Sequence, residues 1–574
     1  MRRSLMLVLA AVLVLPAVEL VPHFAGARAG DLLEWELRGP DPSWLTLDVR
    51  ATPVLVVTAP DGSANARPAF LWQEGRRTSD GAATEEYEAI GERGLRIRHT
   101  ARLPGRHRWA LRDPAGRQLG AGEIEIAAGE GPPGPLRVSP HNARLLAFAD
   151  GTPWIPIGPN IAWASGNDRL AGFEKYFAAL SAAGGTHARV WLASWCAQFE
   201  GGKPYEYRLG QAWLLDGILA RARAHGLHLT LVIDNHHDLV QGKQFPYGET
   251  YVDRAQAFLM APVKDGSEMY DRKLRYLLAR WGADDTVAVW ELFNEVDMAC
   301  MVREIALPWI TAATTLFARL DQDRRLTTVS WVGHDWPRAA EAAKTCIIQL
   351  HGYVLEWTMA DEEVRTAGRD GVAMLIGDAE QANRLSRPFL FGEVGYQGTE
   401  AVNYGNDLDR GGLLLRQHAW AGFLLGGIGS GMNWWWDVHI DEGGLWTQYR
   451  GLASAVKRMD WRDRELLPLT PNPGGPLRVL GWRSPTQALL WPHPRADTWY
   501  AHLIEKKPRP IMGVPMRVTL GGFAPATAFT VARLDQISGD EKAVEQLTSS
   551  ATGDLVLTLP GDCLDIVLHV RRGK

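Results

Sequence analysis

The sequence is poor in cysteine, and its four cysteines are too scattered to encode a site. They are Cys196, Cys300, Cys346 and Cys563 in a chain of 574 residues, and no pair has the C-x-x-C spacing of zinc clusters and redox motifs. One disulfide in an oxidising compartment and four buried, unpaired thiols both remain open. The cysteine pattern therefore predicts no particular chemistry.

Runs of basic residues are also lacking. The chain has 61 Lys and Arg against 66 Asp and Glu, a formal net charge of -5, whereas a nucleic-acid partner requires a concentrated basic patch. The hydrophobic fraction of 46% is that of an ordinary globular protein, and the length allows one large core with smaller domains. We expect no nucleic-acid partner, no cofactor and no metal, and the oligomeric state is left open.

A hydrophobic run lies at the amino terminus. It extends from Leu5 to Val18, follows Arg2 and Arg3, and precedes the segment Ala27-Arg28-Ala29. A membrane anchor is the alternative, but the run is shorter than the roughly 20 residues that cross a bilayer, and the A-x-A ending is typical of a cleavage site. We predict a signal peptide over 1–29 and a secreted or periplasmic protein with no membrane association after cleavage.

Two segments rich in proline and glycine divide the rest of the chain. They lie at 129–135 and 467–475, and a helix or strand does not cross such a segment comfortably. Residues 30–132 alternate short β-rich stretches with turns, as in a small β-sandwich, and residues 470–574 do the same. Between them, residues 136–464 form a third predicted domain of different pattern.

In this central domain, strand-like apolar runs alternate with stretches of helical length, as a parallel sheet with crossover helices requires. Eight such runs fit one (β/α)8 barrel. The predicted fold is therefore α/β, a TIM barrel flanked by an N-terminal and a C-terminal β-sandwich. The expected strands are 154–158, 187–192, 227–233, 287–293, 326–332, 347–350, 389–392 and 431–435, and expected helices are 170–183, 211–224, 269–281, 305–320 and 411–425.

Carboxylates end two of these strands. Glu295 closes the fourth and Glu393 closes the seventh, and in barrel enzymes the reactive groups lie where strands end. One such glutamate can be a surface or ion-paired residue, but two at one rim suit the cleavage of an acetal, which needs an acid and a carboxylate. Glu291 lies one layer deeper on the fourth strand, where we expect a buried structural carboxylate.

The ordered strand-end residues resemble glycoside hydrolase family 5 and its relatives in clan A, the cellulase- and mannanase-type retaining barrel enzymes. The resemblance covers about residues 150–460 of the chain. The flanking segments resemble the immunoglobulin-like front domain and the C-terminal β-domain of some bacterial members of that clan. The residues that carry the resemblance are Arg189, His236, Asn294, Glu295, His351, Tyr353, Glu393, Trp434, Trp435 and Trp436.

The resemblance implies a secreted retaining β-glycoside hydrolase that cleaves a poly- or oligosaccharide by double displacement. Glu295 would be the acid/base and Glu393 the nucleophile, with a raised pKa for the first and a low pKa for the second. Arg189 and Tyr353 would hold the nucleophile ionised and oriented, and both are also expected to bind substrate. The residues implied to contact or line the sugar site are His236, Asn294, His351, Trp434, Trp435 and Trp436. Successive strand residues alternate faces, so the three tryptophans cannot all face the sugar.

Two other hypotheses stay open. Val296 stands where family members usually have proline after the Asn-Glu pair, and with 24 tryptophans in the chain this allows a non-catalytic carbohydrate-binding protein on the same scaffold. A metal-dependent hydrolase is the other, although no H-x-H or H-E-x-x-H spacing supports it. Its ligands would come from Asp234, His236, His237, His351 and Asp378. The sugar, the linkage and endo or exo action are not encoded in the sequence.

Overall fold

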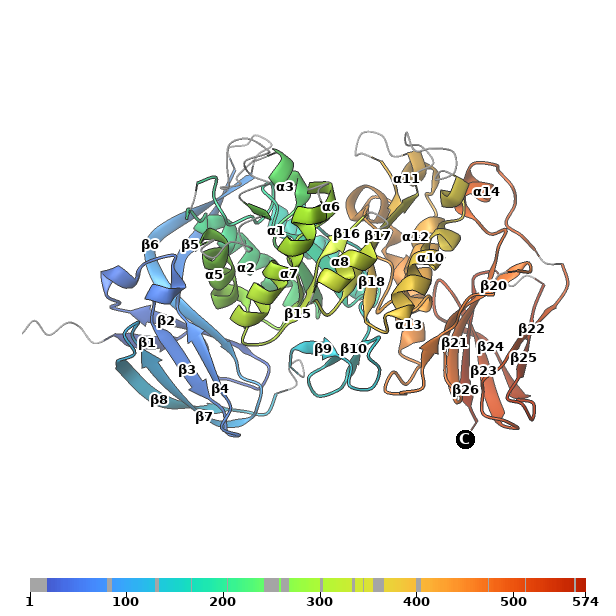
Figure 1. The fold of residues 1–574 in the computed structure, drawn as a ribbon, viewed down its shortest axis with the longest axis horizontal. Helices are drawn as coiled ribbons and strands as arrows, with labels where there is room; N and C mark the ends of the chain where they lie inside the picture. Colours follow the sequence, from blue (N-terminus) through green and yellow to red (C-terminus); the bar gives the residue numbers. More distant parts are fainter. Residues whose placement is uncertain are drawn as a thin grey trace, which may run out of the picture. The chain divides into compact units, whose positions relative to one another are not determined.

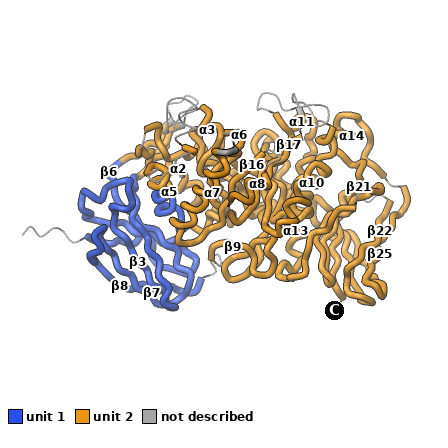
Figure 2. Tube along the Cα trace, viewed as in Figure 1, with its two compact units in different colours: residues 1–73, 91–131, 275–283 blue, residues 74–90, 132–274, 284–574 orange. Residues whose placement is uncertain are grey.

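The computed structural model describes residues 18–79, 85–129, 134–166, 168–203, 205–241, 258–259, 268–299, 303–332, 336–343, 345–354, 366–398, 404–472, 474–511, 513–561 and 564–573 (Figure 1). The chain divides into two compact units (Figure 2). The first comprises residues 1–73, 91–131 and 275–283, and the second residues 74–90, 132–274 and 284–574. Within the described ranges, no helix is long and apolar enough to cross a membrane.

The first unit contains antiparallel strands of two four-stranded sheets. Their orders are β1(Glu19–Pro22), β2(Leu32–Arg38), β6(Glu85–Thr100), β5(Phe70–Ser79) and β4(Ala64–Pro68), β3(Val54–Thr58), β7(Gly105–Arg112), β8(Gln118–Ile126). Side chains along a strand are buried alternately, as Leu33, Trp35 and Leu37 of β2 show, because successive residues point to opposite faces. This alternation supplies the core of the unit.

Strand β1 lies inside the predicted signal peptide. It pairs with β2 from Glu19 opposite Arg38 to Pro22, and the backbones of Ala27 and Ala29 are hydrogen-bonded to Ala127. Cleavage after Ala29 would remove this strand and these bonds. The predicted boundary at residue 29 stays a prediction, and the hydrophobic run up to residue 17 lies outside the described residues.

Parallel strands alternate with helices in the central part of the second unit. One sheet has the order β12(His187–Trp191), β13(His228–Val232), β14(Val287–Glu291), β15(Leu326–Thr328), and another the order β16(Ser330–Trp331), β17(Ile348–Val354), β18(Phe389–Tyr396). The predicted strand at 326–332 is thus split in two. The five predicted helices are confirmed as α1(Arg169–Ala182), α2(Leu209–Ala224), α5(Glu268–Trp281), α7(Arg303–Leu320) and α12(Leu413–Leu424).

The first and last of the eight predicted strands are irregular. Trp154 ends an antiparallel strand, β11(Pro153–Trp154), which pairs with β10(Leu146–Phe148) beside β9(Leu136–Val138). Residues 157–162 then make backbone hydrogen bonds with residues 186–191, and residues 428–434 with residues 389–394. The N–H of Asn160 donates to Asn433, which joins these two segments. Proline residues at 156 and 159 lack an N–H, so the first segment cannot form a regular ladder.

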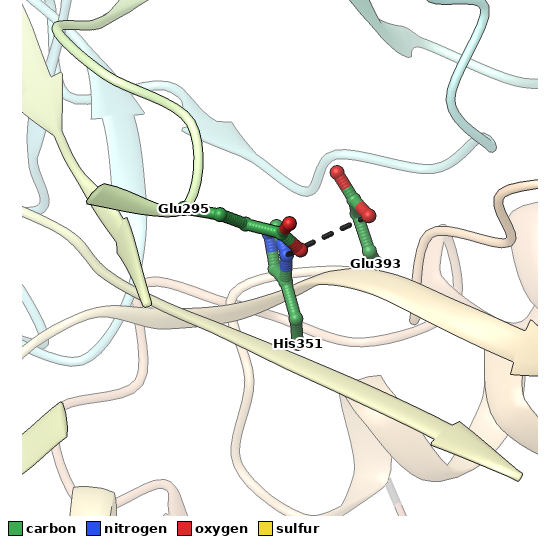
Figure 3. Close-up of side chains that lie close together, drawn as sticks. All are labelled: Glu295, His351 and Glu393. Carbon is green, nitrogen blue, oxygen red and sulfur yellow. Dashed lines mark hydrogen bonds and ion pairs between the residues drawn. The ribbon is translucent and has the colours of Figure 1, made fainter. Parts of the chain in front are cut away.

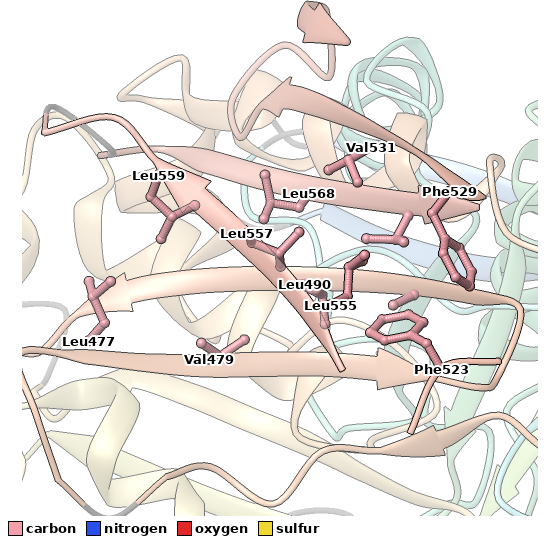
Figure 4. Packing of buried hydrophobic residues seen from close by; sticks show 12 residues of the cluster. Leu477, Val479, Leu490, Phe523, Phe529, Val531, Leu555, Leu557, Leu559 and Leu568 are labelled. Carbon is pink, nitrogen blue, oxygen red and sulfur yellow. The ribbon is translucent and has the colours of Figure 1, made fainter. Parts of the chain in front are cut away.

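A second β-rich region follows the helices. Its six-stranded sheet has the order β19(Leu467–Pro468), β20(Leu477–Arg483), β21(Gln487–Pro494), β26(Ile566–Arg572), β23(Ala528–Asp535), β24(Glu541–Thr548), and β22(Met516–Leu520) pairs with β25(Leu555–Leu559). Buried residues from both sheets form one cluster, including Leu490, Phe529 and Leu557 (Figure 4). Trp482 Nε1 donates to the carbonyl of Phe423 over 2.9 Å and so ties β20 to α12.

Buried histidines make the stability of the second unit pH-dependent. Burial lowers the pKa of His418, whose Nε2 lies 3.1 Å from the carbonyl of Gly371, from 6.5 to about 4. Below pH 6.5 the His418 ring binds a proton in the unfolded chain, whereas in the folded chain it stays neutral until about pH 4. The contribution of the neutral ring to the stability of the fold is therefore complete above pH 6.5 and is lost as the pH falls towards 4. We expect His418→Gln to gain stability relative to the wild type over that window, by a few kcal/mol at order of magnitude. Urea unfolding of both proteins at pH 7.5 and 4.5 measures the difference in stability between the variant and the wild type. The same difference at both pH values would contradict the account.

Candidate active site

Arg189 is the centre of the site. It lies on β12 and is fully buried, and its guanidinium donates to both oxygens of Glu291 over 2.6 and 2.8 Å and to Oε1 of Glu393 over 2.7 Å. The remaining bonds run to Oδ1 of Asn160 over 2.9 Å and Oδ1 of Asn294 over 2.6 Å. A buried charge is tolerated only when it is paired and hydrogen-bonded. Arg189 therefore fixes two carboxylates and two amides from three segments, and Glu291 is the buried structural carboxylate expected from its position.

The backbone at Glu295 is strained. Its φ is 54°, in the left-handed region that non-glycine residues rarely adopt, between β14 and α6(Val296–Ala299). Ser330 Oγ accepts from the N–H of Glu295 over 2.8 Å and donates to Oδ1 of Asn294 over 3.1 Å. Ser330 thus holds both residues of the Asn-Glu pair in this conformation.

Glu295 and Glu393 face each other beside His351 (Figure 3). His351 Nδ1 lies 2.7 Å from Oε1 of Glu295 and 3.6 Å from Oε2 of Glu393, and one oxygen of each carboxylate lies within 4.8 Å of the other. The hydroxyl of Tyr353 donates to Oε2 of Glu393 over 2.5 Å, while the guanidinium of Arg189 donates to Oε1 of the same carboxylate. Both oxygens of Glu393 therefore accept hydrogen bonds, as an ionised carboxylate does.

A chain of contacts determines the tautomer of His351. Since Glu291 accepts twice from Arg189, the group of Gln349 that lies 3.0 Å from Glu291 Oε2 must be the donor Nε2. The same Nε2 lies 3.3 Å from His351 Nε2, which is therefore the acceptor. Burial lowers the pKa of His351, so the ring is neutral and carries its proton on Nδ1, which donates to Glu295. This bond uses Oε1 of Glu295 and leaves Oε2 for a proton.

Burial shifts the pKa of both carboxyl groups upward. It raises the pKa of Glu295 from 4.5 to about 8, with Asp297 and Glu291 adding to the effect and Arg189 opposing it. Burial also raises the pKa of Glu393, although His351, Arg189 and the Tyr353 hydroxyl act in the opposite direction. The prediction of a low pKa for Glu393 is therefore wrong, because removal from water and the nearby Glu295 outweigh these favourable partners.

A cavity of about 340 Å³ opens onto the two carboxylates. Of the residues expected to contact a sugar, the described cavity lining includes His236, Tyr353, Trp434 and Trp435. The other lining residues are Trp191, His237, Glu295, Met298, Val332, Glu393, Gln397 and Gly398.

Four residues expected to bind substrate do not line this cavity. Arg189 and Asn294 are fully buried behind Glu393 and His236, and His351 is 6% exposed against Glu295. Trp436 is 1% exposed, and its Nε1 donates to the carbonyl of Trp163 over 3.0 Å. The structure does not place the Trp436 indole in the cavity, because the chain turns into a π-helix at Trp436–Asp441 and carries the indole into the core.

The residues proposed as metal ligands do not come together. Asp234 accepts from the buried Lys273 over 2.5 Å, and Asp378 accepts from Trp336 Nε1 over 2.9 Å. Among the described residues, the single group with metal-ligand spacing is Glu295, His351 and Glu393. Cys196 and Cys346 are free thiols, whereas Cys300 and Cys563 lie outside the described residues.

The fold of this chain is similar to that of solved structures, although its sequence matches no known family. Models of protein families and curated protein sequences gave no match to this chain. Among solved structures, a candidate glycoside hydrolase from Bacteroides vulgatus matches with a TM-score of 0.63 at 14% identity, over 96% of this chain and 100% of that one. The fold is that of solved glycoside hydrolases. A family 5 glycoside hydrolase from Bacteroides vulgatus matches with a TM-score of 0.52 at 13% identity, over 76% of this chain and 94% of the other.

Proposed function

We propose that the chain is a retaining β-glycoside hydrolase with Glu295 as acid/base and Glu393 as nucleophile. The observation that carries the proposal is the separation of the pair, since carboxylate oxygens within 4.8 Å fit the spacing of about 5–5.5 Å in retaining enzymes better than the roughly 6.5–9.5 Å in inverting ones. We also propose that the site belongs to a (β/α)8 barrel, and that one β-sandwich domain precedes and another follows this barrel in the sequence. The hydrogen bonds of residues 157–162 and 428–434 to their neighbours support a closed barrel.

The chemistry divides between the two glutamates. An oxygen of Glu393 attacks the anomeric carbon while the bond to the leaving oxygen breaks, and Glu295 gives its proton to that oxygen. Water then attacks the anomeric carbon of the glycosyl ester, Glu295 takes the proton from the water, and Glu393 leaves as a carboxylate. Arg189 and Tyr353 orient Glu393 for both steps through the two bonds described above.

A panel of β-glycosides and polysaccharides tests the proposal directly. We expect hydrolysis of at least one substrate with a β-configured sugar as the first product, observed by proton NMR before the anomers equilibrate. An α-configured first product would contradict a retaining mechanism. Binding of a glycan without turnover by folded protein would favour the non-catalytic carbohydrate-binding alternative.

The pKa values predict a pH optimum near neutrality. Glu295 must be protonated to act as an acid, so kcat/KM should fall as the pH rises through about 8. Glu393 must be ionised, so activity should also fall on the acidic side, with a midpoint above the ordinary 4.5. The two midpoints belong to the coupled pair rather than to either residue alone. A profile of kcat/KM from pH 4 to 10 measures both, and full activity at pH 10 would contradict the acid role.

Gln349 is expected to be a positioning residue that acts through His351. Gln349→Leu removes the donor that fixes the His351 tautomer, so kcat should fall and the alkaline midpoint should move away from that of the wild type. Gln417→Leu is a matched control, because Gln417 is also buried and its Nε2 lies 3.4 Å from His493 Nε2. Each variant should lose about 1–3 kcal/mol of stability. If Gln349→Leu loses stability but keeps the wild-type pH profile, its role is structural only.

A metal-dependent hydrolase is the second candidate, and Glu295, His351 and Glu393 are the residues that favour it. The positive Arg189 bonded to Glu393 is unfavourable beside a cation, and His351 already donates to Glu295. Dialysis against a strong chelator distinguishes the two candidates, because the glycosidase should keep its activity whereas a metal-dependent enzyme should lose it.

We propose that the protein is exported to the periplasm or beyond the cell and acts there on carbohydrate. The hydrophobic run from Leu5 supports export, and the pairing of β1 with β2 favours cleavage before Glu19. Sequencing the amino terminus of the mature protein tests both points. An uncleaved amino terminus would contradict export by signal cleavage, whereas a first residue after Glu19 would contradict only the position of the cleavage.

A further inference from the structure

The cavity is lined by two kinds of apolar side chain. The flat indoles of Trp191, Trp434 and Trp435 suit the C–H face of a sugar ring. The others are Met298 of α6, which directly follows Glu295, and Val332, the residue after β16.

Met298 and Val332 lie on segments that are tied together. The N–H of Val332 is 3.1 and 3.2 Å from the two carboxylate oxygens of Asp297, the residue before Met298. The side chain of Met298 is 54% exposed and that of Val332 is 39% exposed. Single exposed apolar residues are ordinary, but these two line the same cavity, beside the group that protonates the leaving oxygen.

Building on the proposed function, we infer that the leaving group is an alkyl or aryl aglycone rather than a second sugar ring. The leaving group must sit against Glu295, because the acid gives its proton to the leaving oxygen. A sugar there would bring hydroxyl groups that need partners and a ring face that needs a flat surface. Valine and methionine offer neither, whereas the flexible, polarisable methionine adapts to an irregular apolar group. Of the described lining residues on the segments that follow Glu295 and β16, Met298 and Val332 are both apolar.

The test compares leaving groups on one sugar. A panel of p-nitrophenyl β-glycosides first selects the sugar, and kcat/KM is then measured for its methyl, butyl and octyl β-glycosides and for a disaccharide with the same non-reducing sugar. Each methylene that is fully buried is worth roughly fourfold, so we expect the octyl glycoside to exceed the methyl glycoside by about tenfold or more. The disaccharide should be slower than the octyl glycoside.

Variants then assign the effect to the two residues. Met298→Gln and Val332→Thr keep the shape but add polar groups, and both should lower the ratio of octyl to methyl kcat/KM. Leu385→Gln is the control, because Leu385 is 37% exposed but is not among the residues of the cavity, and its ratio should equal that of the wild type. Equal rates for methyl and octyl glycosides, or a faster disaccharide, would overturn the aglycone inference alone. No turnover of any glycoside by folded protein would overturn the proposed function itself.

Discussion

Replacing Glu393 with glutamine is expected to lower kcat by on the order of 10⁴-fold or more, as removal of a nucleophile does in other hydrolases. The amide cannot form the glycosyl ester, and it presents one acceptor where Arg189 and Tyr353 now bond to two oxygens. Initial rates with the best p-nitrophenyl β-glycoside measure the loss, and circular dichroism checks that the variant is folded.

Glu341→Gln is the matched control for this variant. Glu341 is an exposed glutamate on α8(Trp336–Ala342) and does not line the cavity, so its variant should keep wild-type activity. If a folded Glu393→Gln protein hydrolysed the substrate within tenfold of the wild-type rate, Glu393 would not be the nucleophile.

Replacing Glu295 with glutamine should have an effect that depends on the leaving group. Alkyl glycosides need protonation of the departing oxygen, so we expect kcat/KM to fall by about 10²–10⁴-fold for them. A p-nitrophenolate departs without a proton, so formation of the glycosyl ester should be slowed much less with that substrate. The alkaline limb near pH 8 should disappear in the variant because its titrating group is gone. Equal losses for both leaving groups, with the alkaline limb intact, would show that Glu295 is not the acid.

Three polar residues that line the cavity could be predicted from the sequence because they follow a simple rule of position. A polar residue that ends an apolar run on a parallel strand lies at the rim of the sheet, and this rule found Glu295, Tyr353 and Glu393. Applied to the first run it would also have found Asn160, which was missed because the predicted strand was ended two residues earlier. The rule fails for Trp436, since a π-helix begins there and turns the side chain inward.

The residues that support and shape the site give weaker sequence signals. Gln349 and Ser330 lie within strands β17 and β16, and only their hydrogen bonds to His351 and Glu295 reveal their importance. Met298 and Val332 look like ordinary core residues in the sequence, because a hydrophobic residue carries no mark of exposure. The raised pKa of Glu393 depends on the balance between burial and four neighbours, which cannot be evaluated before the distances are known.

Trapping of the covalent intermediate tests the central claim most directly. A 2-deoxy-2-fluoro β-glycoside with a good leaving group destabilises the transition states of both steps, so the glycosyl enzyme should accumulate. Mass spectrometry of the digested protein should then show one added fluorosugar on the peptide that contains Glu393. Turnover of ordinary substrate with no adduct on Glu393, or an adduct on another residue, would contradict the assignment of Glu295 and Glu393 as acid/base and nucleophile.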